Sequence, residues 1–173
     1  MTFSPRLRAT VPVIAFALVA GTIATVWSRP SGMTRYPQSA KRELSAPAAE
    51  VAVVDGETLR LAESVVRLLG VAAPARGRDC RRGDGSTFDC GAASAKALAE
   101  LVRDQWVDCR VFGEDPSGRP LAICQAAGAE LNQALVARGW ARATSQLPAL
   151  GAEEAAARAQ HRGLWAQAAD PKL

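Results

Sequence analysis

The sequence of 173 residues is poor in aromatic side chains, which make up 5% of it, and it contains one histidine and four cysteines. So few aromatics argue against a surface built to stack nucleic-acid bases. Four cysteines are too few for a fold held together mainly by disulfides. No two cysteines have the two-to-four-residue spacing of a zinc site, and His161 lies far from them, which disfavours a cysteine–histidine metal centre.

The net charge of +4 is unevenly distributed. Residues 1–45 hold six basic side chains and one acidic side chain, whereas residues 46–173 hold 15 basic and 16 acidic ones. The larger part is therefore close to neutral, which argues against tight binding of nucleic acid driven by net charge alone. With 49% hydrophobic residues the chain is not disordered as a whole, and the roughly 125 residues after the basic segment suffice for one domain.

An uncharged run occupies Ala9–Ser28, behind Arg6 and Arg8. Twenty helical residues, rising about 1.5 Å each, reach across a hydrocarbon core of about 30 Å. We therefore predict that residues 1–28 form a hydrophobic helix, either a cleavable signal peptide or an uncleaved signal anchor that contacts the membrane. Residues 29–49 are rich in proline, serine and alanine and are predicted to be a flexible linker, so that the domain occupies residues 50–173.

From Val51 onward, short β-branched runs alternate with turn residues and with segments of helical spacing. Five strands are predicted, at Val51–Val54, Thr58–Leu61, Val65–Val71, Val107–Phe112 and Pro120–Gln125. Three helices are predicted, at Gly91–Val102, Leu131–Arg138 and Leu150–Arg162. This order predicts an α+β fold: a closed five-stranded OB-type β-barrel with three packed helices, preceded by the N-terminal hydrophobic helix.

The cysteines fall into two pairs along the chain. Cys109 and Cys124 are equally far from the centre of the intervening turn, so they would face each other in a hairpin without a bulge. Cys80 and Cys90 flank one loop, residues 75–90. Disulfides 80–90 and 109–124 are the simplest of three connectivities; reduced cysteines in the core of a cytosolic protein are the alternative. Two disulfides would place the domain in a periplasmic or other extracytoplasmic compartment, anchored or secreted.

Three segments resemble the thermonuclease (staphylococcal-nuclease-like) family. They are VVDGETLRL at Val53–Leu61, VRLLGVAAPA at Val66–Ala75 and EDPSGRPLA at Glu114–Ala122. Two later segments, Gly128–Ala141 and Ala157–Ala166, resemble the family as well, and all five follow the family order over residues 50–168. The resemblance implies an OB-fold with three helices and calcium-dependent hydrolysis of phosphodiester bonds in DNA and RNA.

When the family's site residues are compared with this sequence one by one, the arginines are retained and the carboxylates are not. Arg67 and Arg119 fall on the two arginines that clamp the phosphate and stabilise charge in the transition state. The carboxylates are changed. A metal-binding aspartate of the family is Ala72 here, and the glutamate that serves as general base is Ala75. A second metal-binding aspartate is Glu57, which is one methylene longer.

A general base contributes typically about 10²–10⁴-fold to the rate, and losing metal ligands removes further catalysis. We therefore expect an exported pseudoenzyme, weak or inactive as a hydrolase, with its calcium site weak or lost. It would bind nucleic acid, phosphate or a protein partner, and we assume a monomer. Two alternatives stay open: an active nuclease whose site is completed by Asp79 and Asp84, and a structural envelope domain without a ligand. For Arg67 and Arg119, the structural alternative is a pair of arginines that bind carbonyl groups at the mouth of the barrel or form a salt bridge with Glu57.

Overall fold

The computed structural model describes residues 39–82 and 84–166. The predicted hydrophobic helix of residues 1–28 and the first part of the predicted linker, residues 29–38, lie outside the described residues. The chain divides into two units, Met1–Gly32 and Met33–Leu173, and every described residue belongs to the second. None of the helices described there is long and apolar enough to cross a membrane.

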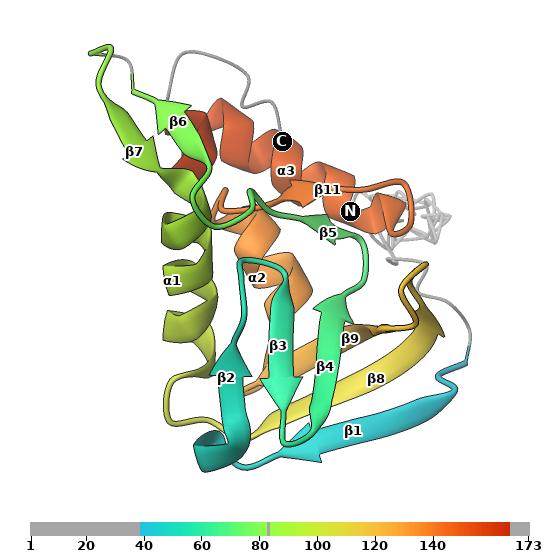
Figure 1. Ribbon diagram of the computed structural model, residues 1–173. Helices are drawn as coiled ribbons and strands as arrows, with labels where there is room; N and C mark the ends of the chain where they lie inside the picture. Colours follow the sequence, from blue (N-terminus) through green and yellow to red (C-terminus); the bar gives the residue numbers. More distant parts are fainter. Residues whose placement is uncertain (1–38, 83, 167–173) are drawn as a thin grey trace, which may run out of the picture. The chain divides into compact units, whose positions relative to one another are not determined.

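Within residues 39–82 and 84–166, the main sheet has seven strands. Six follow one another in the order β1-β8-β9-β4-β3-β2 (Figure 1). The seventh, β10, pairs with β9. All pairs are antiparallel except β4 with β9, which run parallel. The strands are β1 (Arg42–Ala46), β2 (Val51–Val53), β3 (Thr58–Leu61), β4 (Ser64–Leu68), β8 (Val107–Glu114), β9 (Pro120–Ala126) and β10 (Ala129–Glu130).

This sheet is not closed, which corrects the expectation of a closed five-stranded barrel. Strands β1 and β2 lie at its two ends and do not pair with each other. They are consecutive in the chain, separated by Pro47 and a 3₁₀ turn, η1 (Ala48–Glu50). Because proline has no N–H and the turn interrupts the extended backbone, the two segments pair with different partners. The mixed α+β class and the three α-helices are as predicted.

Strand β1 lies within the segment predicted to be a linker. Its five residues pair with β8, with Leu44 opposite Cys109 and Ala46 opposite Val107. Ala46 is fully buried and Leu44 packs against the core. In the sequence, the short alternation of apolar and polar residues in this strand is difficult to recognise beside the neighbouring charged residues. The sheet therefore begins at Arg42, before the predicted domain boundary at residue 50.

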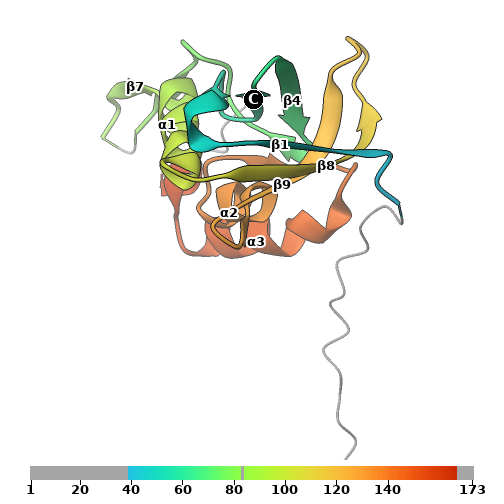
Figure 2. The ribbon, with the colours of Figure 1, turned by 90° about the horizontal axis from the view of Figure 1, so that it is seen from below.

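Three α-helices lie in the described part of the chain: α1 (Cys90–Val102), α2 (Leu131–Ala137) and α3 (Gly151–Ala159). Helix α1 is capped by the preceding residue, Asp89, whose Oδ1 accepts a hydrogen bond of 2.7 Å from the N–H of Ala92. Figure 2 shows α2 and α3 on one side of β8 and β9, with β4 on the other. Two short 3₁₀ turns, η2 (Pro148–Leu150) and η3 (Gly163–Ala166), flank α3.

A buried polar residue, Asn132, joins α2 to the sheet. Its Oδ1 accepts a hydrogen bond from the Cys124 N–H at 3.1 Å. Its amide nitrogen donates to the carbonyl oxygens of Leu69 at 2.8 Å and Ala122 at 3.1 Å. Since Leu69 follows β4 and Ala122 belongs to β9, this side chain fixes the place where the two parallel strands meet.

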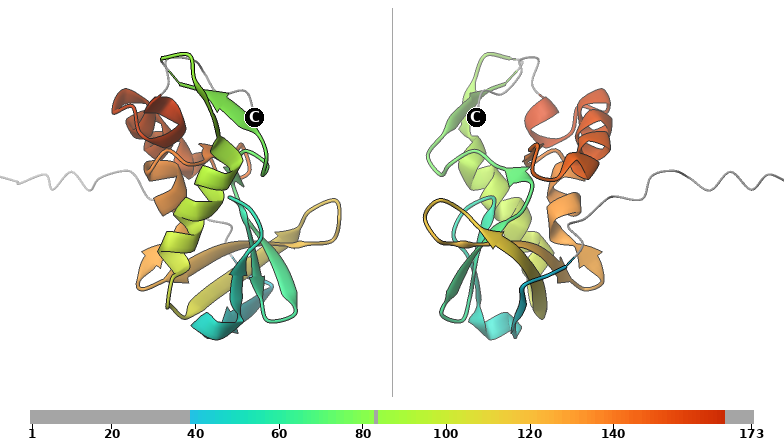
Figure 3. Two further views of the ribbon diagram at one scale, coloured as in Figure 1. Left: turned by 60° about the vertical axis from the view of Figure 1, so that its left-hand side comes forward. Right: turned by 90° about the vertical axis from the view of Figure 1, so that its right-hand side faces the viewer.

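Two further pairs of strands are short. Strand β5 (Val71–Ala72) pairs with β11 (Arg142–Ala143), and β6 (Asp79–Arg81) pairs with β7 (Thr87–Asp89). The second pair makes a hairpin of the segment predicted to be a loop, and it stands beyond the amino end of α1 (Figure 3). The predicted disulfide between Cys80 and Cys90 is confirmed and ties β6 to the first residue of α1.

The second predicted disulfide, Cys109–Cys124, is also confirmed, and the two cysteines are directly opposed in β8 and β9. The hairpin is nevertheless bulged: its register shifts by one residue between Val111 and Gly113. Its turn lies between the paired residues Glu114 and Pro120 and has an odd number of residues. The bulge compensates for the odd turn, so the symmetric register expected at the cysteines is restored.

Candidate functional site

The site begins at the turn between β2 and β3. Gly56 packs so closely against α1 that a Cβ atom on it would lie 2.6 Å from the Cβ of Ser94 and 2.8 Å from that of Ala73. Only glycine allows this approach. Asp55 supports the turn, since its Oδ1 accepts a hydrogen bond of 2.9 Å from the Glu57 N–H. The turn thus fixes the backbone of Glu57 directly before β3.

Both carboxylate oxygens of Glu57 are bound by groups of the same chain. Oε1 lies 2.5 Å from Nη2 of Arg67, which is in β4. Oε2 accepts a hydrogen bond of 2.8 Å from the N–H of Ala73, directly after β5. The Glu57 side chain is 16% exposed and that of Arg67 is 31% exposed, so the pair is partly screened from water. The salt bridge considered as the structural alternative for Arg67 is therefore present.

Asp115 organises the turn that carries Arg119. Its Oδ1 accepts hydrogen bonds from the N–H groups of Ser117, at 2.8 Å, and of Arg119, at 3.0 Å. Its Oδ2 lies 2.7 Å from Nε of Arg119. Gly118 has a φ of 76°, a conformation that side chains rarely adopt, which explains the glycine before Arg119. The Asp115 side chain is 3% exposed and that of Arg119 is 39% exposed.

Asp115 also joins the two halves of the site. Its Oδ2 lies 4.0 Å from Nη1 of Arg67, so one carboxylate oxygen faces both arginines. We call Glu57, Arg67, Asp115 and Arg119 the ion cluster; its two carboxylates balance its two guanidinium groups. Asp115 is not among the site residues expected from the sequence. Its place four residues before Arg119, in an Asp-Pro-Ser-Gly turn, was the available signal, because aspartate accepts hydrogen bonds from the backbone that follows it.

The two carboxylates have pKa values displaced in opposite directions. Burial raises the pKa of Glu57 above its ordinary value of 4.5, and the opposing effects of the Ala73 N–H and the Arg67 guanidinium do not cancel it. For Asp115, desolvation acts to raise the pKa, but the hydrogen bonds from Arg119 and Ser117 outweigh it and the pKa is lowered. Glu57 is thus the carboxylate of the cluster that protonates first as the pH falls.

The residues do not fit a calcium site of the kind the resemblance implies. Ala72 is half-buried in β5 and Ala75 is exposed, and neither offers a ligand oxygen from its side chain. Both oxygens of Glu57 are already bound. Within residues 39–82 and 84–166, no three histidine, cysteine, aspartate or glutamate side chains are grouped so that they could hold a metal ion.

The two loop carboxylates considered as replacements lie elsewhere. Asp84 is exposed, and its Oδ1 accepts hydrogen bonds from the N–H and the hydroxyl of Ser86, at 2.9 and 2.7 Å. Asp79 lies in β6, opposite Asp89 of β7. The structure therefore brings Glu57, Arg67 and Arg119 together around Asp115, but not with either of these aspartates.

Comparison with known proteins identifies the family. Residues 65–167 match the profile of the family described as staphylococcal nuclease homologue. The chain belongs to this family. It is also 31% identical over 120 residues to the succinoglycan biosynthesis protein ExoI of Rhizobium meliloti (strain 1021). That match covers 67% of this chain and 63% of ExoI, so the chain spans less than two thirds of this relative's length.

Proposed function

We propose that this domain is a catalytically degenerate member of the staphylococcal nuclease family that binds phosphate groups of nucleic acid through Arg67 and Arg119. One observation carries the proposal. Glu57 stands where the resemblance implies a metal ligand, yet its two oxygens are bound by the Arg67 guanidinium and the Ala73 N–H. A carboxylate held in this way serves as the counter-ion of an arginine rather than as a ligand of a cation.

Hydrolysis would need a group that removes a proton from the attacking water. Alanine at position 75 has none, and losing a general base alone lowers a rate by about 10²–10⁴-fold. The alanine at position 72 removes a further oxygen ligand. Losses within one site are not additive, but each alone leaves a poor catalyst. We therefore expect binding without appreciable cleavage.

The arginines retain the chemistry of an anion site. Both guanidinium groups face the same oxygen of Asp115 and are about one-third exposed. Arg119 contacts Asp115 through Nε, and within the described residues no hydrogen bond or ion pair involves its two terminal nitrogens. Guanidinium groups form charge-assisted hydrogen bonds to phosphate oxygens. Because Glu57 and Asp115 compete for the same donors, we expect weak binding that decreases further with added salt.

A structural role without a ligand is the second candidate, and the balance of charge in the ion cluster favours it. Glu57, Arg67 and Asp115 connect the start of β3, β4 and the β8–β9 turn whether or not an anion binds. The name of the Rhizobium meliloti relative refers to succinoglycan biosynthesis and not to nucleic acid. An active nuclease with a rearranged site has no such support, because Asp79 and Asp84 lie outside the cluster.

We further propose that the domain lies outside the cytoplasm, as a monomer, with residues 1–28 as its signal peptide or signal anchor. The two disulfides support this location, because such bonds persist in oxidising compartments.

Fluorescence polarisation of a labelled single-stranded oligonucleotide, titrated with the full-length chain, tests the proposal. We expect weak, salt-sensitive binding that Arg67→Ala and Arg119→Ala both reduce, while Arg60→Ala, which removes an exposed arginine of β3, leaves it unchanged. Arg67→Lys keeps the positive charge beside Glu57 and therefore controls for a loss of binding that is caused by misfolding. Absence of binding at low salt, or equal binding by all variants, would favour the structural role.

A further inference from the structure

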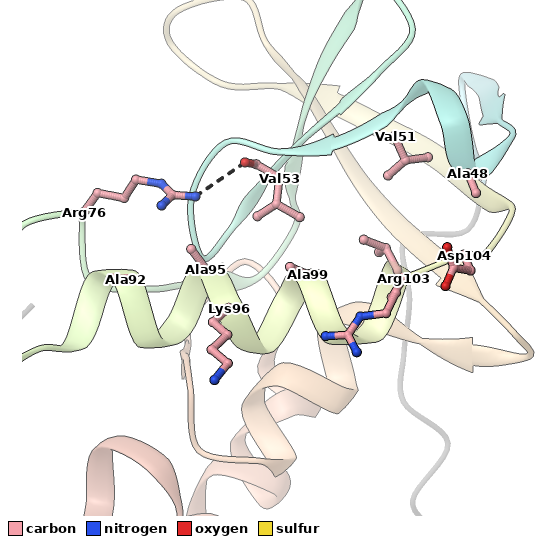
Figure 4. Close-up of a pocket in the computed structure, with 11 residues that line it drawn as sticks. Ala48, Val51, Val53, Arg76, Ala92, Ala95, Lys96, Ala99, Arg103 and Asp104 are labelled. Carbon is pink, nitrogen blue, oxygen red and sulfur yellow. Dashed lines mark hydrogen bonds between the residues drawn. The ribbon is translucent and has the colours of Figure 1, made fainter.

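A second surface, separate from the ion cluster, lies between α1 and the edge strand β2 (Figure 4). It is a groove of about 470 Å³, within the range of roughly 300–1,000 Å³ that is usual for binding sites. Its lining includes none of the four residues of the ion cluster. A ligand in this groove would therefore be independent of Arg67 and Arg119.

The floor of the groove is apolar and made of small side chains. Val51 and Val53 of β2 line it together with Ala95 and Ala99 of α1 (Figure 4). The described lining contains no aromatic side chain, so a nucleic-acid base would have no stacking partner there. Short aliphatic side chains match this floor better.

The rim of the groove is basic. Arg76, Lys96 and Arg103 line it and are exposed, and Asp104 is the acidic residue beside them. Within residues 39–82 and 84–166, neither Lys96 nor Arg103 takes part in an ion pair. Cations without partners beside an apolar groove favour a ligand that carries carboxylates.

The backbone of β2 adds a third feature. The strand pairs with β3 on one edge, with Ala52 opposite Arg60, and it ends the sheet on the other edge. The Ala62 N–H donates to the Glu50 oxygen, and the Val54 N–H donates to the Thr58 oxygen. Backbone groups that point toward a partner alternate along an antiparallel strand. Those of Val51 and Val53 therefore point away from β3.

Two of these outward groups are already bound. The Val51 N–H donates to the Ala48 oxygen, and Nη2 of Arg76 donates to the Val53 oxygen at 3.5 Å. In the described part of the chain, no hydrogen bond reaches the Val51 oxygen or the Val53 N–H. One residue of a parallel strand, placed beside Ala52, would pair with these two groups. An antiparallel strand would need groups that are already bound.

We propose that this groove binds an extended acidic segment of a partner protein, which adds to β2 as a parallel strand. The two hydrogen bonds beside Ala52 set its register, and the residues on either side point with Val51 and Val53 into the groove. Small aliphatic side chains occupy the floor, and flanking carboxylates pair with Lys96 and Arg103. Addition of a strand to an open sheet edge is an established way in which domains recognise extended peptides.

Phage display of random linear heptapeptides against the full-length chain tests this proposal. We expect enrichment of sequences that combine Asp or Glu with Val, Ile or Ala. For an enriched peptide made synthetically, Lys96→Glu and Arg103→Glu should each weaken binding by roughly fivefold, the upper value for one exposed charge pair. Arg138→Glu, which reverses an exposed charge at the end of α2, should not change binding. Amide hydrogen exchange at Val53 should slow when the peptide binds.

Three results would overturn the proposal: selection without an acidic consensus, affinity unchanged by both rim variants, or exchange at Val53 unchanged by the peptide. An oligonucleotide that slows exchange at Val53 and displaces the peptide would assign the groove to nucleic acid instead, which also contradicts it. Arg67→Ala should bind the peptide normally, so this experiment is independent of the proposed phosphate site.

Discussion

The Glu57 carboxylate lies 2.5 Å from the Arg67 guanidinium, and its second oxygen is bound by the Ala73 N–H at 2.8 Å. Glutamate is one methylene longer than the aspartate that the family resemblance implies at this place. We infer that this longer side chain serves as the internal counter-ion of Arg67. An incoming phosphate would have to displace it.

Removing the charge of Glu57 should therefore strengthen anion binding. We expect Glu57→Gln to raise the affinity for a labelled single-stranded oligonucleotide roughly two- to fivefold, the effect of losing one partly exposed ion pair of up to about 1 kcal/mol. Glu63→Gln, which removes an exposed carboxylate in the β3–β4 turn, is the matched control. Fluorescence polarisation measures both, and equal affinities for Glu57→Gln and the wild type would contradict the counter-ion role.

The raised pKa of Glu57 predicts how stability depends on pH. Between 4.5 and the raised value, the folded chain holds a proton at Glu57 that the unfolded chain releases. The resulting contribution to stability is fully present below pH 4.5 and is lost as the pH rises through the raised pKa. Glu57→Gln has no proton to lose at this position. The free energy of unfolding of the wild type, relative to this variant, should therefore fall as the pH rises above 4.5.

Urea unfolding of both proteins between pH 4 and pH 7 measures this difference. Asp115, whose pKa is lowered, loses its contribution as the pH falls, but it does so in both proteins and largely cancels. A difference that stays constant, or that grows in favour of the wild type as the pH rises, would show that Glu57 is not destabilised by burial.

Asn132 should be necessary for the junction of β4, β9 and α2. In Asn132→Leu, the Cys124 N–H and the carbonyl oxygens of Leu69 and Ala122 lose a buried partner. Each unsatisfied buried group costs about 1–3 kcal/mol, so we expect a loss of about 3 kcal/mol or more in the free energy of unfolding. Chemical denaturation measures it, with Gln133→Leu on the exposed side of α2 as the control. Equal stability of the two variants would contradict this role.

The Cys109–Cys124 disulfide should stabilise the β8–β9 hairpin. Replacing both cysteines by alanine removes a cross-link that restricts the unfolded chain, and we expect about 2–4 kcal/mol of lost stability. Unfolding under oxidising conditions should reveal the difference. Under reducing conditions the difference in the free energy of unfolding between the wild type and the double variant should shrink. A difference that does not depend on reductant would show that the disulfide is not its source.

Local features of the fold were predictable from the sequence. Thr58–Leu61 has the predicted bounds, and α1 differs from its predicted start by one residue. These elements depend on periodicity and turn residues that are adjacent in the chain. The Cys109–Cys124 pairing was also predicted correctly, although the hairpin contains a bulge that the argument from the sequence did not include.

Features that depend on distant contacts were not predictable in the same way. Strand β1 consists of five residues and is recognisable only through its pairing with β8. The open sheet follows from the interruption at Pro47, and the parallel meeting of β4 and β9 involves segments more than fifty residues apart. Within the site, Arg67 and Arg119 were predicted from the family resemblance. The role of Asp115 as their shared counter-ion required the geometry of the folded turn.

We propose that the site binds nucleic acid without cleaving it, and a cleavage assay is the most direct test of the missing catalysis. Cleavage of single-stranded DNA by the full-length chain is followed over time with added calcium, beside Arg67→Ala. We expect no cleavage by the wild type above that of the Arg67→Ala variant. Calcium-dependent cleavage by the wild type that Arg67→Ala abolishes would contradict it.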